Sequence, residues 1–83
     1  MRFQARVEVS LKPGYSDPEG NAVKRSLKEL RYDVDSVKVS KVYRIVLDSD
    51  SKEAAEKTLE EMCKRLLANP TRDDYEIHIE GEA

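Results

Sequence analysis

The length of 83 residues predicts one small domain, in which folding hides only about 60% of the surface that the unfolded chain exposes. Apolar and charged residues each make up 39% of the chain, a polar balance for this size that favours self-association. The 15 basic and 17 acidic residues are interleaved and no apolar run approaches a membrane span, so we expect a cytoplasmic protein that binds neither nucleic acid nor membrane.

The first predicted strand covers residues 3–11, where apolar and polar residues alternate with period two. Pro13 and Gly14 then predict a type II turn, because proline fixes its own φ and glycine can take a positive φ at the next position. Asp17 and Pro18 predict a helix start: the carboxylate can accept from free backbone N–H groups, and proline has no N–H to leave unpaired.

The first helix is predicted to begin at Pro18. Val23, Leu27 and Leu30 form a narrow apolar stripe, which we expect to pack on the sheet. Gly20 in the first turn costs about 1 kcal/mol relative to alanine. We therefore expect another segment to approach the backbone closely at Gly20.

A hairpin of two strands is predicted next, over residues 34–39 and 43–47, with a tight connection near Ser40-Lys41. The second of these strands also carries Val42 and Val46 on the opposite parity, so it is apolar on both faces. A strand of this kind is usually covered on both sides. We predict that a second copy of the chain covers Val42 and Val46.

The second helix is predicted to begin with a capping box formed by Asp50 and Glu53. It carries a broad apolar stripe that comprises Ala55, Leu59, Met62, Cys63, Leu66 and Leu67. Asn69 and Pro70 end it, because asparagine tolerates a left-handed conformation and proline cannot continue a helix. A last strand is predicted over residues 75–79, where apolar and polar residues alternate again.

The predicted fold is therefore α+β with the order β-α-β-β-α-β. Each helix and strand has an apolar face to bury, which favours a mostly antiparallel four-stranded sheet with both helices packed on one face. We expect a single domain over residues 1–83 that oligomerises through the sheet.

No catalytic, cofactor-binding or metal-binding constellation is recognisable. Cys63 lies on the apolar edge of the second helix beside acidic residues, which predicts a packing role, and His78 is predicted to be exposed. One cysteine and one histidine cannot build a structural zinc site, and neither a phosphate-binding loop nor a CxxC motif is present. An interaction module and an amino-acid-sensing regulatory module both remain open.

Several segments together resemble one family, the PurS subunit of phosphoribosylformylglycinamidine synthase. The most specific are Leu11 to Gly20, with the pattern L-K-P-G-x-x-D-P-x-G, and Leu66 to Pro70, with the pattern L-L-A-N-P. The resemblance extends over residues 9–14, 17–23, 27–32, 37–41, 62–70 and 74–77. Arg31 and Ser40 stand where the family usually has glycine. At a left-handed position, Arg31 would cost about 1 kcal/mol relative to glycine.

The resemblance implies a non-catalytic subunit in purine biosynthesis that bridges two larger subunits and supports ammonia transfer. A glutaminase subunit would release ammonia, and a synthetase subunit would bind ATP and magnesium and act on formylglycinamide ribonucleotide. This chain would form a homodimer or higher homo-oligomer and hold no cofactor. The matching turn segments give the candidate partner interface: Lys12, Pro13, Gly14, Asp17, Pro18, Glu19, Gly20, Asn69 and Pro70. Turn and cap chemistry alone is the competing interpretation of these residues. A free-standing ligand-binding regulatory module is the alternative function.

Overall fold

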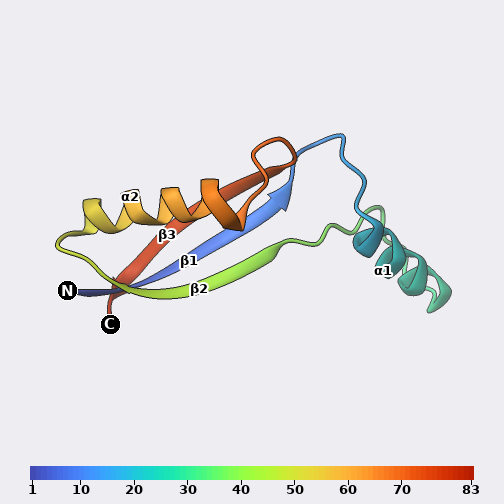
Figure 1. Cartoon of the computed structure of the whole chain (residues 1–83). Helices are drawn as coiled ribbons and strands as arrows, with labels where there is room; N and C mark the ends of the chain where they lie inside the picture. The colour runs from blue at the N-terminus through green and yellow to red at the C-terminus, as the bar shows by residue number, and fades with distance from the viewer.

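The computed structural model describes residues 1–83 and is an α+β fold, as the sequence predicts. The elements in chain order are β1 (Arg2–Leu11), α1 (Pro18–Glu29), β2 (Lys41–Asp48), α2 (Lys52–Met62), the π-helix η1 (Cys63–Leu67) and β3 (Asp73–Glu82). The strands form a three-stranded antiparallel sheet in the order β2-β1-β3. Helix α2 covers one face of this sheet, whereas α1 projects away from its far end (Figure 1).

The core lies between α2 and the covered face of the sheet. In the central strand β1, Val7 pairs with Tyr43 of β2 and with Ile77 of β3, so one row of apolar side chains crosses the sheet. Leu59 of α2 packs on this face and is fully buried. The period-two pattern of β1 thus places its alternate residues in the core: Phe3, Ala5, Val7 and Val9.

Helix α2 begins one residue later than the predicted capping box would place it. Ser51 occupies the N-cap position, and its hydroxyl oxygen accepts a hydrogen bond from the Ala54 backbone N–H at 3.1 Å. The prediction of a capping box formed by Asp50 and Glu53 was therefore wrong. Ser51 takes the extended conformation that a cap requires, with φ −153° and ψ 166°.

The π-helix changes the apolar stripe of α2. The Ala68 N–H donates to the Cys63 carbonyl at 3.0 Å, a bond to the fifth preceding residue, so this turn holds more residues than an α-helical turn. The prediction that Leu66 faces the core was wrong, because the wider turn leaves Leu66 83% exposed and buries Ala68 instead. Ala68 is extended rather than helical, and Asn69 is not left-handed as predicted.

The predicted four-stranded sheet was also wrong. Residues 34–39 form no strand, so there is no hairpin at Ser40-Lys41. The outer edge of β2, where the hairpin partner would pair, stays unpaired in the β2-β1-β3 sheet. The segment instead runs back beside α1, and a Cβ built on Gly20 would lie only 2.3 Å from the Val37 carbonyl oxygen. The predicted close approach at Gly20 is confirmed.

Helix α1 does not pack on the sheet, contrary to the prediction. The only buried residue of this 12-residue helix is Gly20. It ends in a Schellman motif: Arg31 has a φ of +72°, and the Arg31 and Tyr32 N–H groups donate to the Lys28 and Leu27 carbonyls. Arg31, which stands where the resembled family usually has glycine, thus has the left-handed conformation that glycine favours.

Two parts result, which we call the body (residues 1–11 and 41–83) and the arm (residues 17–39). The arm protrudes from one end of the body, and both termini lie at the opposite end (Figure 1). The radius of gyration is 16.2 Å, whereas a compact chain of this length has about 12 Å. The chain is therefore extended, measuring 51 × 27 × 14 Å. No helix combines the length and the apolar character that crossing a bilayer requires.

Candidate docking site at the neck

The arm joins the body through two chain segments, residues 12–16 and Ser40, which we call the neck. The first segment begins with the predicted turn. The Tyr15 N–H donates to the Lys12 carbonyl at 3.3 Å, and Gly14 has a φ of +91°, as the third residue of a type II turn requires. This turn moves the chain away from the end of β1 toward α1.

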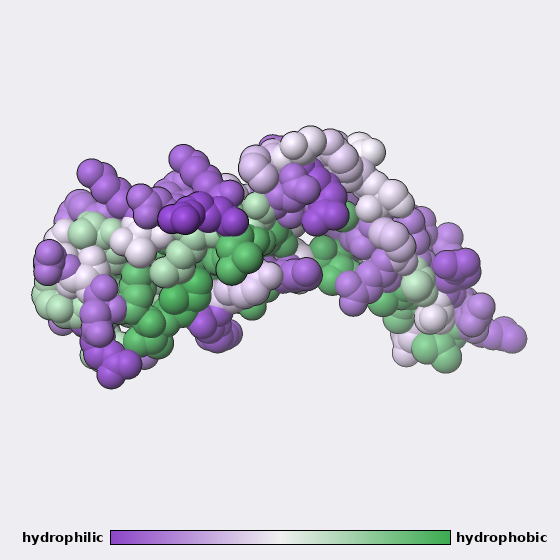
Figure 2. Space-filling model, in the orientation of Figure 1, coloured by the Kyte–Doolittle hydropathy of each residue, from purple (hydrophilic) through white to green (hydrophobic).

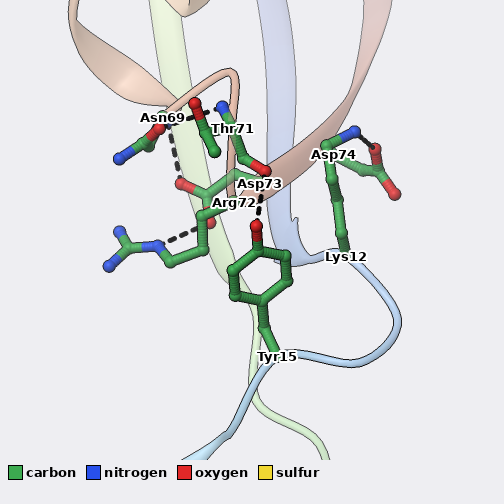
Figure 3. Close-up of polar contacts among 7 residues, drawn as sticks. All are labelled: Lys12, Tyr15, Asn69, Thr71, Arg72, Asp73 and Asp74. Atoms are coloured by element: carbon green, nitrogen blue, oxygen red, sulfur yellow. Dashed lines mark hydrogen bonds and ion pairs between the residues drawn. The ribbon is translucent and has the colours of Figure 1, made fainter.

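The neck is fastened to the start of β3 and to the loop that precedes it. The Lys12 ammonium lies 2.6 Å from the Asp74 carboxylate, and the Lys12 N–H donates to the Arg72 carbonyl at 2.8 Å. The Tyr15 hydroxyl donates to the Thr71 carbonyl at 3.1 Å (Figure 3). The structure thereby brings the two predicted interface segments together, 12–20 and 69–70.

The loop before β3 is built around Asn69 and Asp73. The Asn69 side-chain oxygen accepts from the Thr71 N–H at 3.0 Å, and the Asp73 carboxylate accepts from the Asn69 N–H at 2.9 Å (Figure 3). The Asn69 N–H, and after it the Arg72 side chain, lowers the pKa of Asp73. Asn69 therefore has a structural role, in addition to any role in docking.

The Asp17 carboxylate links the start of α1 to the segment that returns beside it. One carboxylate oxygen accepts from the Gly20 N–H and the other from the Val39 N–H, each at 2.9 Å. These two backbone donors lower the pKa of Asp17, Gly20 contributing more than Val39. The predicted cap is confirmed, and the same carboxylate also holds the return segment, which the sequence did not reveal.

The predicted interface residues lie around two hollows at the neck. A cleft of about 830 Å³ opens between the arm and the core side of the body, and it is lined in part by Asp17, Pro18, Glu19, Asn69 and Pro70. A smaller hollow of about 320 Å³ includes Lys12, Pro13 and Gly14, together with residues of the uncovered sheet face. Only Gly20, which is buried beneath Val37, lines neither hollow.

The large cleft also holds residues that the sequence did not assign to an interface. Basic side chains lie along it: Lys41, Lys64, Arg65 and Arg72. Leu66 lines the cleft as well and is the most exposed large apolar residue of the chain. Only the π-helix explains its exposure, and no sequence pattern indicated a π-helix.

The reactive side chains of the body have structural explanations. Cys63 is fully buried in the core, as predicted, and burial, followed by the nearby Glu60, raises its thiol pKa. The Tyr75 hydroxyl donates to the Glu60 carboxylate at 2.7 Å, which raises the pKa of Tyr75 to about 12. His78 is exposed and lies 3.7 Å from Glu76. No three metal-ligating side chains of these 83 residues lie together.

Val42 and Val46 lie on the uncovered face of the sheet, as their parity predicts. They are 46% and 51% exposed. The strand register places Arg44 opposite Arg6, and Arg6 opposite His78, so the valines flank a row of basic residues. Figure 2 shows apolar surface on the body and again along the arm. Whether a second copy covers this sheet face stays a prediction.

The fold and the neck together define a class of protein: a small, elongated α+β module whose polar residues build turns, helix caps and exposed ion pairs. A family model described as "PurS: Phosphoribosylformylglycinamidine (FGAM) synthase" matches residues 4–81. A PurS subunit of Methanothermobacter thermautotrophicus is 39% identical over 79 residues, which cover 95% of this chain and 94% of that protein. The chain belongs to the PurS family of FGAM synthase subunits.

Solved structures agree with this membership over the whole chain. The crystal structure of Methanocaldococcus jannaschii PurS has a TM-score of 0.86 at 38% identity, covering 98% of this chain and 99% of the other. A chain in the structure of PurLQS from Thermotoga maritima has a TM-score of 0.87 at 25% identity, covering 95% and 98%. The relatives therefore include a chain solved within the PurLQS assembly.

Proposed function

We propose that this chain is the PurS subunit of an FGAM synthase in purine biosynthesis, where it joins a PurL-type synthetase and a PurQ-type glutaminase subunit. The observation that carries this proposal is the match of nearly the whole chain to a chain of the PurLQS assembly. The extended shape supports it, because an arm and a body with separate exposed surfaces can contact two partners at once.

In this role the chain positions its partners and performs no chemical step. The glutaminase subunit releases ammonia, and the synthetase subunit uses ATP and magnesium to convert formylglycinamide ribonucleotide to its amidine. The side chains around the neck are engaged in turns, caps and ion pairs, which suits a rigid spacer that keeps the ammonia route between the two subunits closed to solvent.

Reconstitution tests the proposal. The two larger subunits are assayed with glutamine and with free ammonia, each with and without this chain. We expect the chain to raise glutamine-dependent turnover and to change ammonia-dependent turnover far less, because it acts on transfer between subunits. Full glutamine-dependent turnover without this chain would overturn the proposal.

The predicted interface residues around the neck, in the two hollows beside it, form the proposed contact surface for the larger subunits. Lys12 and Glu19 are the most informative residues, because Lys12 makes only an exposed ion pair with Asp74 and Glu19 makes no side-chain hydrogen bond or ion pair. Exposed ion pairs contribute about 0–1 kcal/mol, so changing both residues to alanine leaves the fold intact.

The double variant Lys12→Ala/Glu19→Ala is therefore compared with Glu56→Ala/Lys57→Ala. The control removes the same two charges from the exposed side of α2, away from the neck. We expect weaker binding of the larger subunits only for the neck variant, measured by co-purification and by the concentration that gives half-maximal turnover. Equal binding by both variants would remove the neck from the interface.

We further propose that copies of the chain associate through the uncovered sheet face, with Val42 and Val46 at the contact. The support is their exposure on a face that no helix of the same chain covers. Val42→Ser/Val46→Ser should lower the molar mass measured by light scattering at a given concentration. An unchanged mass would exclude this face.

A further inference from the structure

The direction of the arm relative to the body depends on the neck. Helix α1 buries only Gly20, which lies against the return segment of the same arm. No hydrogen bond or ion pair joins residues 17–39 directly to the body. Figure 1 shows α1 pointing away from the end of the sheet. What holds the arm in this direction must therefore be sought in residues 12–16 and Ser40.

Each segment of the neck makes a side-chain hydrogen bond to the body. In the first segment, Lys12 is fixed before the turn, through its backbone N–H and its ammonium group. After the turn, the only bond to the body runs from the Tyr15 hydroxyl to the Thr71 carbonyl, at 3.1 Å. In the second segment, the Ser40 hydroxyl donates to the Glu8 carboxylate at 3.0 Å.

The acceptors of these two hydrogen bonds differ in rigidity. The Thr71 carbonyl belongs to the backbone of a loop in which Asn69 accepts from the Thr71 N–H and Asp73 accepts from the Asn69 N–H. The Glu8 carboxylate, in contrast, is the end of a flexible side chain. The Tyr15 ring turns about only two side-chain bonds, and it spans the gap between the neck and the loop (Figure 3). Tyr15 is therefore the stiffer of the two connections.

A small rotation at the neck becomes a large displacement at the end of the arm. Helix α1 is about 18 Å long for its 12 residues, so a rotation of about 10° moves its far end by about 3 Å. The same rotation changes the width of the cleft between the arm and the body, which predicted interface residues line from both sides. Two subunits bound to the arm and to the body would shift relative to each other by a similar distance.

We propose that Tyr15 is a positioning residue for ammonia transfer. Its hydroxyl, bonded to the Thr71 carbonyl, fixes the direction of the arm and thereby the placement of the two larger subunits relative to each other. The role in transfer rests on the proposed function, whereas the direction of the arm is a property of this chain alone. One hydrogen bond of this kind shifts an equilibrium about two- to tenfold, which sets the size of the expected effects.

Distance measurement in the full chain tests the first half of the proposal. Spin labels are placed on Glu29→Cys in the arm and Glu56→Cys in the body, both exposed, while the native Cys63 is fully buried. Labelled chain is diluted into unlabelled chain, so that each distance lies within one copy. Tyr15→Phe, which removes only the hydroxyl, should at least double the fraction of distances outside the wild-type distribution. An unchanged distribution would overturn the proposal.

The matched control is Tyr32→Phe, which removes the same hydroxyl from the far end of the arm, where Tyr32 is 61% exposed and its hydroxyl makes no hydrogen bond. This control should leave the distance distribution unchanged. Equal changes from both substitutions would overturn the proposal, because the effect would then not come from the neck.

Turnover of the reconstituted complex tests the second half. Tyr15→Phe should lower the ratio of glutamine-dependent to ammonia-dependent turnover at least twofold, without raising the concentration of this chain that gives half-maximal turnover. An unchanged ratio would overturn the role in transfer, and a raised half-maximal concentration with an unchanged ratio would make Tyr15 a contact residue instead. If glutamine-dependent turnover is full without this chain, the proposed function fails, and the distance measurement still decides whether Tyr15 fixes the arm.

Discussion

Replacing Gly20 by alanine should destabilise the arm, although the same change in an ordinary exposed helix stabilises it by about 1 kcal/mol. The added Cβ would lie 2.3 Å from the Val37 carbonyl oxygen and 2.8 Å from a carboxylate oxygen of Asp17. The Val37 oxygen belongs to the backbone, and Asp17 holds the Val39 N–H, so neither neighbour can move alone. The return segment must shift as a unit away from α1.

The expected net effect follows from two opposing terms. Overpacking costs about 1–3 kcal/mol, and the gain in helix propensity recovers about 1 kcal/mol, so Gly20→Ala should lose up to about 2 kcal/mol. Because about 1.4 kcal/mol corresponds to a factor of ten, the arm should open up to about 30 times more often. Hydrogen exchange of the amides in residues 17–39 measures this opening.

The matched control is Asn21→Ala, one residue further along α1. Asn21 is exposed, and its side chain makes no hydrogen bond, so alanine there should slow exchange in the arm through helix propensity alone. The two substitutions should therefore act in opposite directions in the arm and leave β1 and α2 unchanged. If Gly20→Ala slows exchange as Asn21→Ala does, the close approach to Val37 does not constrain the arm.

Three further predictions concern the cap of α1, its end and the core. The lowered pKa of Asp17 means that its contribution to stability is present above the unfolded-state pKa of about 3.9 and is lost as the pH falls through the lower folded-state pKa. Nuclear magnetic resonance should show the Gly20 amide shifting over that acid range in the wild type but not in Asp17→Asn. Arg31→Gly should stabilise the arm by about 1 kcal/mol, seen as slower hydrogen exchange, because glycine takes a positive φ without strain. In denaturant unfolding, Leu59→Ala should cost about 2–5 kcal/mol and Leu66→Ala less than about 0.5 kcal/mol, and similar costs would contradict the π-helical register.

Local patterns predicted the body better than the arm. The alternation in residues 3–11 and 75–79 reports a strand with one buried face, and both strands are present because their partners are found along the whole length of β1. The valines of residues 34–39 suggest a strand, yet they form none, although the outer edge of β2 is unpaired. The segment is held on α1 instead, by the hydrogen bond from the Val39 N–H to Asp17 and by the close approach of Val37 to Gly20, and these contacts between distant residues are not encoded in the local pattern.

The position of α1 was unpredictable for a related reason. An apolar stripe shows that a helix packs against something, but it does not say that the partner lies in the same chain. The stripe of Val23, Leu27 and Leu30 was therefore assigned to the sheet, which is where a helix of a self-sufficient domain would pack. The prediction for Leu66 was wrong for a different reason: the π-helix Cys63–Leu67 changes the register of the stripe, and no residue pattern marks where a π-helix begins.

The predicted interface residues around the neck fall into two groups, those that the fold itself requires and those that it does not. Asp17 and Gly20 are required for the arm itself, since one carboxylate caps α1 and holds the return segment while the missing side chain lets that segment approach. Asn69 is required for the loop before β3. The fold alone therefore explains why Asp17, Gly20 and Asn69 occur in the family pattern, without contact to another subunit.

Lys12 and Glu19 differ, because the fold depends on neither of them. Lys12 contributes a side chain that only adds an exposed ion pair, and the Glu19 side chain makes no hydrogen bond or ion pair. A docking surface at the neck must therefore be sought in these two residues and in the exposed Pro70, rather than in the capping pair beside them. This is why the double alanine variant, and not a change at Asp17, separates contact with a partner from folding of the arm.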